Sequence, residues 1–440
     1  MVVGEFTEDV DIVVIGGGPA GYACAFRAAE LGRDVVLVDP RGVLGGNCLH
    51  EACIPTKTVL HAIDLTRQSS HPCLTGDPPS IDADATRKWI DRITKRLGGG
   101  LAAAAKAKGV EILAGRARFL SNREIQVAGE HVSRIRFKRA VICCGGGEQQ
   151  SANGALTVNA LCDSLDRVSG TAVVLGNGPW ALEAAAICHS MGASTTLVPG
   201  SHPVLPGVPT QLVDTIGKAC GFNIMQTGEA SVEATNDGCR ITVGEQILDS
   251  DVFIDASSKP PNFDGLDLGA AGVDLTDGGL IGTDERCVTS EPRILAAGAC
   301  AEILGDAGMS LAQGRVAAEV IAGRAAAWDP AAVPTLVFSH PQLAWCGSCP
   351  DDAETLLIPW SHSGLAVGMN AGTGCTLICW DKESGTLLGA GAVGVGASEM
   401  ADLFTVAIEL GSTLQDLADM SPAHPTRSEL LLEAARQALA

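Results

Sequence analysis

Two cysteines with four residues between them, Cys48 and Cys53, form the pair in this chain best suited to thiol–disulfide chemistry. Five residues of regular α-helix rise about 7.5 Å, which exceeds the roughly 4.4–6.8 Å between Cα atoms that a disulfide accepts. If the two cysteines bond, the chain between them must depart from a regular helix, and the next helix should begin near Pro55. Cys53 then lies at a helix N-terminus, which stabilises a thiolate, and Cys48 lies further out, where a substrate thiol can reach it.

The segment before these cysteines has the pattern of a strand, a glycine-rich turn, a helix and a second strand. Residues 10–15 and 33–39 are the apolar runs typical of buried parallel strands. Between them, Gly16 permits a tight bend, Gly18 lets the backbone approach a pyrophosphate, and Gly21 lets helix and strand pack closely. Asp39 lies where a carboxylate can bind an adenosine ribose. The pattern predicts a dinucleotide site whose phosphates meet the N–H groups of a helix N-terminus.

The same unit occurs again at residues 171–198, with a helix expected over residues 182–191. Two such units predict two dinucleotides, and a second, nicotinamide-type site would use Gly176, Gly178 and Ala181. This unit is less regular than the first. Pro199 stands where an NAD site needs a carboxylate, and no arginine of an NADP site is nearby, although Ser201 and His202 offer weaker hydrogen bonds. Pro179 and Trp180 add bulk to the turn. NAD is therefore the expected nicotinamide, but NADP or none stays open.

The order of these patterns predicts an α/β protein with two Rossmann-like dinucleotide-binding domains and a C-terminal α+β domain. We expect a first FAD-binding part over residues 1–149 and an NAD(P)-type domain over residues 150–268. The chain should then return to the FAD-binding domain over residues 269–330 and end in the α+β domain over residues 331–440. The last of these contains strands with turns, followed by two helices.

Composition narrows the class of protein. A net charge of −21 argues against nucleic acid and anionic membrane surfaces as partners. No apolar run is long enough to span a membrane, and the acidic, polar beginning of the chain is not a targeting signal, so a cytoplasmic location is expected. Most of the 16 cysteines stand alone in apolar stretches, as buried thiols do. For the close pair Cys346 and Cys349, two packed thiols are favoured over a second redox dithiol, and no spacing indicates a metal site.

The segment from residue 45 to residue 57 resembles the redox-active motif of the class I pyridine nucleotide–disulfide oxidoreductases, most closely their dihydrolipoamide dehydrogenase branch. That family has Gly-Gly-x-Cys, four further residues and Cys-Ile-Pro-(Ser/Thr)-Lys. This chain departs from the pattern at Asn47, where the family usually has threonine, and at residues 50–52. The resemblance extends along nearly the whole chain.

By this resemblance, Cys53 would be the thiolate that contacts the flavin, and Cys48 the thiol that exchanges with substrate. Lys57 would lie near flavin N5, paired with Glu183. Ala299 replaces an aspartate of the family that contacts the flavin ribitol, and Gln313 replaces a histidine, yet FAD is still expected. The residues that the resemblance and the glycine turn assign to FAD are Gly16, Gly18, Pro19, Ala20, Gly21, Asp39, Gly46, Asn47, Cys48, Lys57, Gly145, Gly298, Ala299 and Ala312.

Near the end of the chain, His424 would by the same resemblance be the general base that takes a proton from the substrate dithiol, with Glu429 orienting its ring. The alternative is purely structural, because Thr426 and Glu429 have the spacing of a helix capping box. The resemblance makes the α+β domain over residues 331–440 the interface, or dimerisation, domain. In the family the His424 segment reaches the disulfide of the partner subunit, so the resemblance implies an obligatory homodimer.

Together these features predict an FAD-dependent dithiol/disulfide oxidoreductase that moves electrons from a dihydrolipoyl dithiol, through Cys48 and Cys53 and then FAD, to NAD⁺. Its substrate would be a lipoyl-bearing carrier protein or a small dithiol. One alternative is a dithiol oxidase without nicotinamide, which hands electrons to oxygen or a protein acceptor. Another is a non-catalytic flavoprotein subunit of a lipoyl-protein complex. Reduction by NADH distinguishes the first alternative, and turnover of free dihydrolipoamide distinguishes the second.

Overall fold

A computed structural model describes residues 7–130, 132–146, 156–235, 238–257, 261, 263–301 and 306–440. The chain divides into two compact units. The first contains residues 1–55, 88–149 and 258–329, and the second contains residues 56–87, 150–257 and 330–440. The predicted boundary between residues 149 and 150 lies outside the described residues, and the four-part division stays a prediction.

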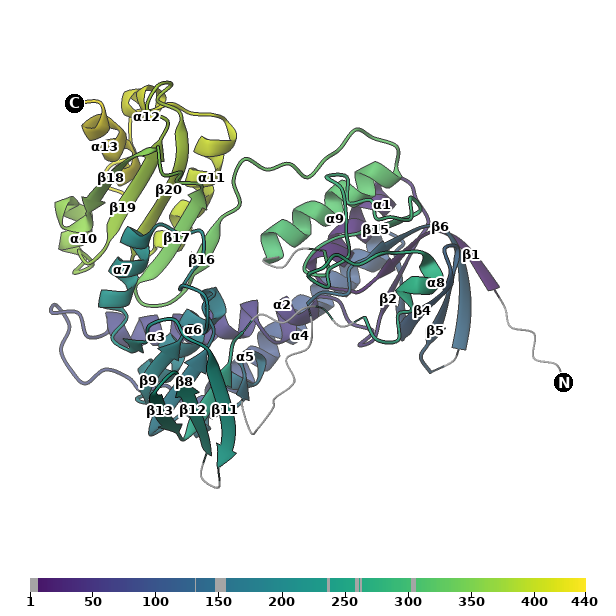
Figure 1. Ribbon diagram of the computed structural model, residues 1–440, viewed down its shortest axis with the longest axis horizontal. Coiled ribbons are helices and arrows are strands. Elements are labelled where there is room, and N and C mark those ends of the chain that lie inside the picture. Colours follow the sequence, from purple (N-terminus) through teal and green to yellow (C-terminus); the bar gives the residue numbers. More distant parts are fainter. Residues whose placement is uncertain are drawn as a thin grey trace. The chain divides into compact units, whose positions relative to one another are not determined.

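The first unit is built on one sheet in the order β3–β2–β1–β6–β5–β4, with β15 paired to β6 (Figure 1). The pairs β1–β2, β2–β3, β1–β6 and β15–β6 are parallel, whereas β4–β5 and β5–β6 are antiparallel. The strands are Thr7–Ile15 (β1), Val35–Asp39 (β2), Glu111–Ala114 (β3), Arg116–Ser121 (β4), Glu124–Ala128 (β5), Val132–Ile142 (β6) and Ile294–Ala296 (β15). β2 is buried along its whole length, as its continuous apolar run predicted.

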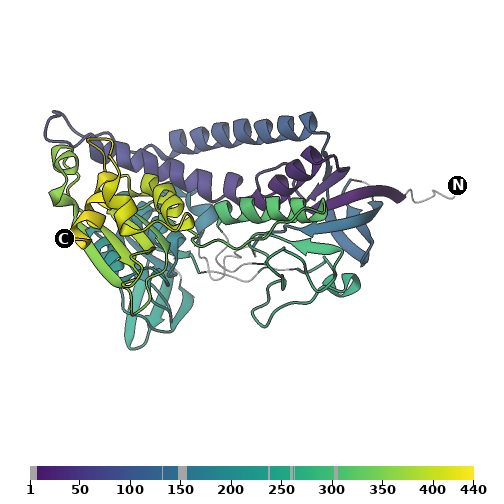
Figure 2. The same cartoon turned by 90° about the horizontal axis from the view of Figure 1, so that it is seen from above.

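Small residues let two helices of this unit pack closely side by side (Figure 2). These are α1 (Pro19–Glu30) and α9 (Ala307–Ile321). A Cβ atom on Gly314 would lie 2.2 Å from the carbonyl oxygen of Ala20, so only glycine permits this approach. Cys24 is fully buried in α1, and burial raises the pKa of its thiol to about 12, as expected for a packed thiol. The other helices that begin in this unit are α2 (Gly46–His50), α3 (Cys53–Gln68) and α8 (Leu268–Ala271).

The second unit contains a parallel sheet in the order β10–β9–β8–β14–β7 and a separate antiparallel sheet β11–β12–β13. The strands are Leu156–Thr157 (β7), Thr171–Leu175 (β8), Ser194–Val198 (β9), Asn223–Ile224 (β10), Ala230–Thr235 (β11), Gly238–Val243 (β12), Gln246–Ser250 (β13) and Val252–Asp255 (β14). The helices are α5 (Val158–Leu161), α6 (Pro179–Ser190) and α7 (Thr210–Ala219), and α4 (Ala83–Ala107) begins here. Helix α6 therefore begins three residues earlier than predicted, because proline is favoured in a first turn.

A third sheet, also in the second unit, has only antiparallel pairs in the order β16–β17–β20–β19–β18. Its strands are Thr335–Val337 (β16), Gln342–Gly347 (β17), Glu354–Pro359 (β18), Cys375–Trp380 (β19) and Leu387–Gly394 (β20). Its helices are α10 (Gly364–Gly368), α11 (Ala401–Glu409), α12 (Leu414–Asp419) and α13 (Glu429–Ala438). Ile378 of the sheet shares one buried core with Phe404 and Leu431 of the helices. The predicted fold class is confirmed.

Among the described residues, no helix is both long enough and apolar enough to cross a bilayer. The predicted cytoplasmic location stays a prediction.

Candidate redox site and its cofactor-binding turns

The glycine-rich turn after β1 has the geometry that its sequence predicted. Gly16 has φ +107°, and a Cβ atom there would lie 2.2 Å from the carbonyl oxygen of Cys143. A Cβ atom on Gly21 would lie 1.8 Å from the carbonyl oxygen of Gly16, so helix and strand approach as closely as expected. Gly18 caps α1 in an extended conformation, and the nearest atom to its missing Cβ is 3.9 Å away. The N-terminus of α1 is therefore uncrowded, as an anion-binding turn requires.

Asp39, at the end of β2, orients this turn. It is 8% exposed, and its carboxylate oxygens accept hydrogen bonds from the backbone N–H groups of Gly17 at 2.8 Å and Arg41 at 2.9 Å. An ionised carboxylate has about four acceptor positions, so two remain for ribose hydroxyls. The same side chain can thus hold the turn and bind a nucleotide.

The cysteine segment is attached directly to the glycine turn. The Gly45 N–H donates to the carbonyl oxygen of Gly17 at 2.8 Å. Gly46 has φ +55°, and a Cβ atom there would lie 2.7 Å from the Cα atom of Gly18. The close approach at Gly46 needs glycine, and so does position 45, where φ is +120° and a Cβ atom would lie 2.4 Å from the Leu49 side chain. These contacts with the glycine turn hold Cys48, which follows two residues later in α2, at the edge of the sheet where the nucleotide turn lies.

The chain between the two cysteines departs from a regular helix, as a bond between them would require. Helix α2 ends at His50, and the N–H groups of Glu51 and Ala52 both donate to the carbonyl oxygen of Asn47, at 2.9 and 2.7 Å. Helix α3 begins at Cys53 itself, so the prediction of a start near Pro55 was two residues late. Proline lies within the first turn, where its missing N–H group has no helical partner to lose.

Both cysteines are partly exposed, and Cys53 begins the helix that follows the break. Burial raises the pKa of the Tyr22 phenol, which the sequence did not single out, and negative charge on the Cys48 and Cys53 side chains raises it further. Cys53 is the first residue of a 16-residue helix, whose N-terminal partial charge favours its thiolate.

Lys57 and Glu183 form the ion pair that the resemblance implied. The Lys57 Nζ atom donates to Glu183 Oε2 at 2.6 Å, and the Glu183 side chain is 2% exposed. The N–H group of Phe338 donates to the other carboxylate oxygen at 3.1 Å, and the lysine Nζ lies 5.0 Å from the centre of the Phe338 ring. Sequence reasoning missed Phe338, because nothing in the apolar stretch around it indicates a contact with residues so distant in the chain.

His424 and Glu429 also meet. His424 Nδ1 lies 2.8 Å from Glu429 Oε2, while Oε1 of the same carboxylate accepts from the Thr426 N–H at 2.5 Å. The hydrogen bonds from His424, first, and Thr426 lower the pKa of Glu429 below its usual value. The Thr426 hydroxyl donates to the carbonyl oxygen of Ala423, and Ser428 is the N-cap residue of α13, so only half of the alternative capping box forms.

This contact sets the tautomer of His424. An ionised Glu429 draws the ring proton to Nδ1 and leaves Nε2 as the basic nitrogen. The His424 side chain is 79% exposed, so Nε2 is open to a group brought from outside the chain.

Turns after β6 and β15 complete the edge of the first sheet where β1 ends. Gly145 and Gly298 have φ +80° and +82°, and a Cβ atom on Gly298 would lie 3.0 Å from that of Ala20. Gln313, which is 4% exposed in α9, accepts the Gly298 N–H at 2.7 Å through its side-chain oxygen. The residue noted only as a departure from the family therefore has a structural role. Ala299 and Ala312 are half-buried.

The second glycine turn keeps the fold of the first without its carboxylate. Gly176 has φ +145°, Gly178 caps α6 with no atom within 4 Å of its missing Cβ, and Ala181 is buried. Pro199 follows β9 and is buried, whereas Trp180 is 45% exposed at the start of α6. The turn is thus open to a nucleotide, but its usual ribose ligand is missing.

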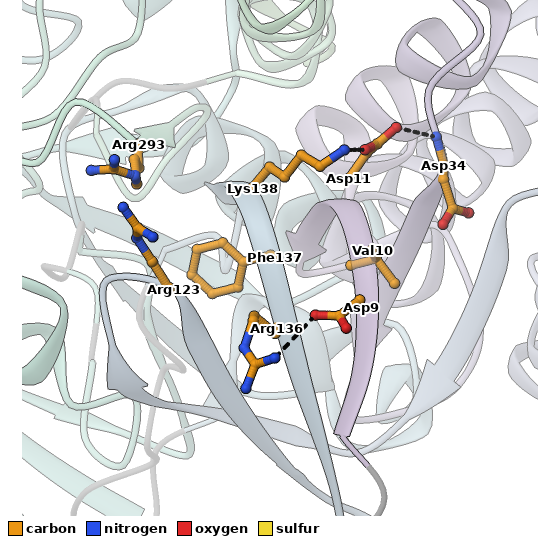
Figure 3. A pocket seen from close by; sticks show the side chains of 9 residues that line it. All are labelled: Asp9, Val10, Asp11, Asp34, Arg123, Arg136, Phe137, Lys138 and Arg293. Atoms are coloured by element: carbon orange, nitrogen blue, oxygen red, sulfur yellow. Dashed lines mark hydrogen bonds and ion pairs between the residues drawn. The ribbon is translucent and has the colours of Figure 1, made fainter.

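A hollow of about 610 Å³ lies elsewhere in the first unit (Figure 3). It is lined by residues near the amino end of β1 and by the adjoining part of β6, and two ion pairs cross it, Lys138 with Asp11 at 2.5 Å and Arg136 with Asp9 at 3.5 Å. Ligands of open parallel sheets bind at the carboxyl ends of the strands, so this hollow is not the nucleotide site. Among the described residues, no cluster of His, Cys, Asp or Glu side chains is placed to hold a metal ion.

Comparison with known proteins agrees with this geometry. The sequence profile of the pyridine nucleotide–disulphide oxidoreductases matches residues 10–319, and that of their dimerisation domain matches residues 333–435. The dihydrolipoyl dehydrogenase of Geobacillus stearothermophilus is 32% identical over 463 residues, covering 100% of this chain and 98% of that protein. The dihydrolipoyl dehydrogenase of Bacillus subtilis is 31% identical over 466 residues, with coverages of 100% and 98%.

Solved structures share the fold over almost the whole chain. LpdA from Mycobacterium tuberculosis has a TM-score of 0.87 at 23% identity, covering 98% of this chain and 100% of that chain. The HOCl-induced flavoprotein disulfide reductase RclA from Escherichia coli has a TM-score of 0.85 at 22% identity, covering 97% and 99%.

The cofactors of the matched family are FAD and NAD(H), and its dimerisation domain, matched here, supports a homodimer. The relationship predicted from the cysteine motif is thus confirmed over the full length of the chain: it belongs to the pyridine nucleotide–disulphide oxidoreductase family and is a flavin disulfide oxidoreductase.

Proposed function

We propose that this enzyme oxidises a dihydrolipoyl dithiol and passes the two electrons through Cys48 and Cys53, and then FAD, to NAD⁺. The observation that carries the proposal is the attachment of the cysteine segment to the nucleotide turn. Gly45 and Gly46 contact Gly17 and Gly18 directly, so a flavin nucleotide on this turn would lie beside the cysteines.

The residues of the first unit fit FAD. The open N-terminus of α1 suits a pyrophosphate, Asp39 keeps acceptor positions for a ribose, and the turns at Gly145 and Gly298 lie at the same sheet edge. When bound, the flavin accepts two electrons from the dithiol pair and releases them to the nicotinamide. Ala299 offers no carboxylate to the ribitol, so that contact of the family is absent.

The protein's own residues can divide the thiol chemistry between them. A substrate thiolate attacks the sulfur of Cys48 in the disulfide, forming a mixed disulfide and releasing Cys53 as a thiolate. The helix N-terminus at Cys53 stabilises that leaving group. The second substrate thiolate then attacks the substrate's own sulfur, closing the substrate disulfide and releasing Cys48. Substrate thus loses two electrons and two protons.

His424 is suited to take those protons. Glu429 fixes Nδ1 of its ring, so Nε2 is the basic nitrogen, and the ring is exposed. In a homodimer, His424 of one subunit would serve the cysteine pair of its partner. Lys57 supplies a positive charge that Glu183 holds in place, next to the helix turn that begins with Cys53. A lipoyl arm on a carrier protein or a small dithiol would be the substrate.

Replacing Cys48 with serine tests the proposal. We expect Cys48→Ser to lose at least about 10³-fold in dihydrolipoamide oxidation, because the exchanging nucleophile is gone, while flavin remains bound. The matched control is Cys73→Ser, since Cys73 is exposed in the turn that follows α3. Full activity of Cys48→Ser would show that the cysteine pair is not the dithiol site.

A second candidate, a dithiol oxidase that uses oxygen or a protein acceptor, is favoured by Pro199 and Pro179 in the nicotinamide-type unit. Anaerobic mixing of the flavin-loaded enzyme with NADH separates the two. Rapid loss of oxidised-flavin absorbance supports the dehydrogenase. No loss with NADH, but loss with dihydrolipoamide, supports the oxidase.

A further inference from the structure

One disulfide is present far from Cys48 and Cys53 in sequence. It joins Cys349, in the turn after β17, to Cys379 in β19, with a Cα–Cα distance of 5.7 Å. The expectation of two packed thiols at Cys346 and Cys349 was therefore wrong for the second of them. Cys346 lies in β17 and is buried in the core that the sheet shares with the helices. Its sulfur lies 3.2 Å from the Thr405 hydroxyl.

We propose that Cys349 and Cys379 form a stable disulfide staple, chemically separate from the Cys48/Cys53 pair, which fastens the β17–β18 turn across the C-terminal sheet. This inference concerns the stability of the sheet and does not rest on the proposed function.

The backbone is built to bring the two sulfurs together. Gly347, Gly389 and Cys379 are paired in one row across β17, β20 and β19. The end of β17 is thus two strands away from Cys379, or roughly 10 Å, and the chain must turn back over β20 to reach it. Ser348 does so by donating its N–H to the carbonyl oxygen of Leu388 at 2.9 Å.

Two glycines make this crossing possible. Gly347 has φ +85°, and a Cβ atom there would lie 2.2 Å from the carbonyl oxygen of Leu388. A Cβ atom on Gly389 would lie 2.5 Å from the carbonyl oxygen of Ser348. Any side chain at either position would lift the turn off the sheet and move Cys349 away from Cys379. The disulfide and the two glycines are therefore parts of one arrangement.

The staple supports the helix that follows His424 and contains its partner Glu429. Cys379 lies in β19, and α13 packs against β18 and β19. Ile378, next to Cys379, shares a core with Leu430 and Leu431 of α13, and this helix begins at Glu429, the partner of His424. Fastening the turn to β19 therefore stabilises the strands against which α13 packs.

Exposure sets the order of the chemistry. Cys349 is partly exposed, whereas Cys379 is fully buried. With a low-molecular-weight disulfide as oxidant, the Cys349 thiolate attacks one of its sulfurs and expels one small thiol. Cys379 then attacks the Cys349 sulfur and expels the second. The pair loses two electrons and two protons, and the small disulfide becomes two thiols.

The surroundings of Cys349 make this exchange slow. Asp351 and Asp352 follow it in the same exposed turn, and their negative charge disfavours a thiolate and repels anionic thiols. Cys53, by contrast, begins a helix that favours its thiolate. The staple should therefore stay closed under mild reduction that opens the Cys48/Cys53 pair.

Peptide mapping of the full-length enzyme tests the link directly. The enzyme is unfolded in the presence of an alkylating agent and without reductant, so that buried free thiols such as Cys346 and Cys375 are also blocked, and it is then cut with trypsin. Residues 325–382 contain no lysine or arginine before Lys382, so Cys346, Cys349, Cys375 and Cys379 remain on one peptide. A second cut after Glu354 separates the first two cysteines from the last two. We expect the halves to stay joined through Cys349 and Cys379 until reductant is added.

The controls decide which sulfurs are joined. The halves should stay joined in Cys346→Ala and come apart in Cys349→Ser. Unjoined halves in the wild-type enzyme, a Cys346–Cys349 link within one half, or a link through Cys375 would each overturn the proposal.

The thermal unfolding temperature is a second measurement, and it does not depend on enzyme activity. Strong reductant should lower the unfolding temperature of the wild-type enzyme by on the order of 10 °C, and that of Cys349→Ser hardly at all, since its staple is already absent. Equal reductant-induced shifts in the two proteins would show that the link contributes no stability.

Discussion

Removing one member of the Lys57–Glu183 pair should destabilise the fold by different amounts, depending on which member is removed. Lys57→Met leaves the Glu183 carboxylate, which is 2% exposed, without a counter-charge from Lys57, while the Phe338 N–H still donates to it. Glu183→Gln leaves a lysine that is 27% exposed and can turn toward water. A stranded buried charge costs much more than a charge that can be solvated.

The magnitudes follow from this exposure. Breaking a buried ion pair from the side that leaves a charge behind costs about 3–5 kcal/mol, which is the expected loss for Lys57→Met. For Glu183→Gln we expect about 1–2 kcal/mol, because water replaces much of the lost interaction. The double variant contains no stranded charge, so its loss should be smaller than the sum of the single losses by about 2–3 kcal/mol.

Urea unfolding followed by circular dichroism measures these losses in the free energy of unfolding. The control is the surface pair Lys382–Glu354. Its side chains are 75% and 46% exposed, and Lys382 Nζ lies 3.2 Å from Glu354 Oε1. Lys382→Met should change stability by less than about 1 kcal/mol. If Glu183→Gln were as destabilising as Lys57→Met, or if the two losses simply added, the argument from unequal burial would be refuted.

Three further outcomes can be measured. Gly46→Ala should cost flavin affinity, seen as cofactor loss on gel filtration, because its methyl group would strike the nucleotide turn; Gly244→Ala, at a nearly equal φ of +58° with no atom nearby, should retain flavin. Glu429→Gln should lower dithiol oxidation roughly 10²-fold at neutral pH by removing the acceptor that orients His424. Because the pKa of Glu429 is lowered from its usual 4.5, its stabilising effect is present above that value and is lost as pH falls through the lower one, so unfolding curves of wild type and variant should converge in acid. Pro199→Glu should tighten NADH binding by about 5–150-fold, equivalent to about 1–3 kcal/mol, and unchanged binding would contradict the role assigned to that position.

The nucleotide turn and the cysteine segment could be predicted from local sequence patterns, because both depend on residues that are neighbours in the chain. The tight bend at Gly16 and the close contact at Gly21 follow from glycine spacing alone. The break in the helix between Cys48 and Cys53 was predicted for the case in which the two cysteines bond, because the rise of a regular helix exceeds the reach of a disulfide. The start of α3 was misplaced by two residues because proline is accepted at more than one position of a first turn.

Contacts between residues that are distant in the chain could not be predicted from local sequence patterns. Gln313 was noted as a departure from the family, yet its oxygen holds the Gly298 N–H, a contact between a helix and a strand end. The disulfide partner of Cys349 is 30 residues away in sequence, whereas the sequence pattern paired Cys349 with the nearby Cys346. Alternation in β17 places Cys346 on the helix-covered face, and only the pairing of β20 with both neighbours brings Cys379 within reach.

The two glycine turns show that a carboxylate after the second strand has two separable tasks. In the first unit, Asp39 both holds the Gly17 N–H and remains available to a ribose. In the second unit the first task is done by other groups: the Asn177 side chain donates to the carbonyl oxygen of Pro203 at 3.0 Å, and the Leu205 N–H donates to the Asn177 carbonyl oxygen at 2.7 Å. Pro199 can therefore replace the carboxylate without unfolding the turn. We therefore expect Pro199 to affect only the affinity for the nucleotide and not the fold of the turn. For this reason, reduction by NADH can distinguish a dehydrogenase from an oxidase even though the fold is the same.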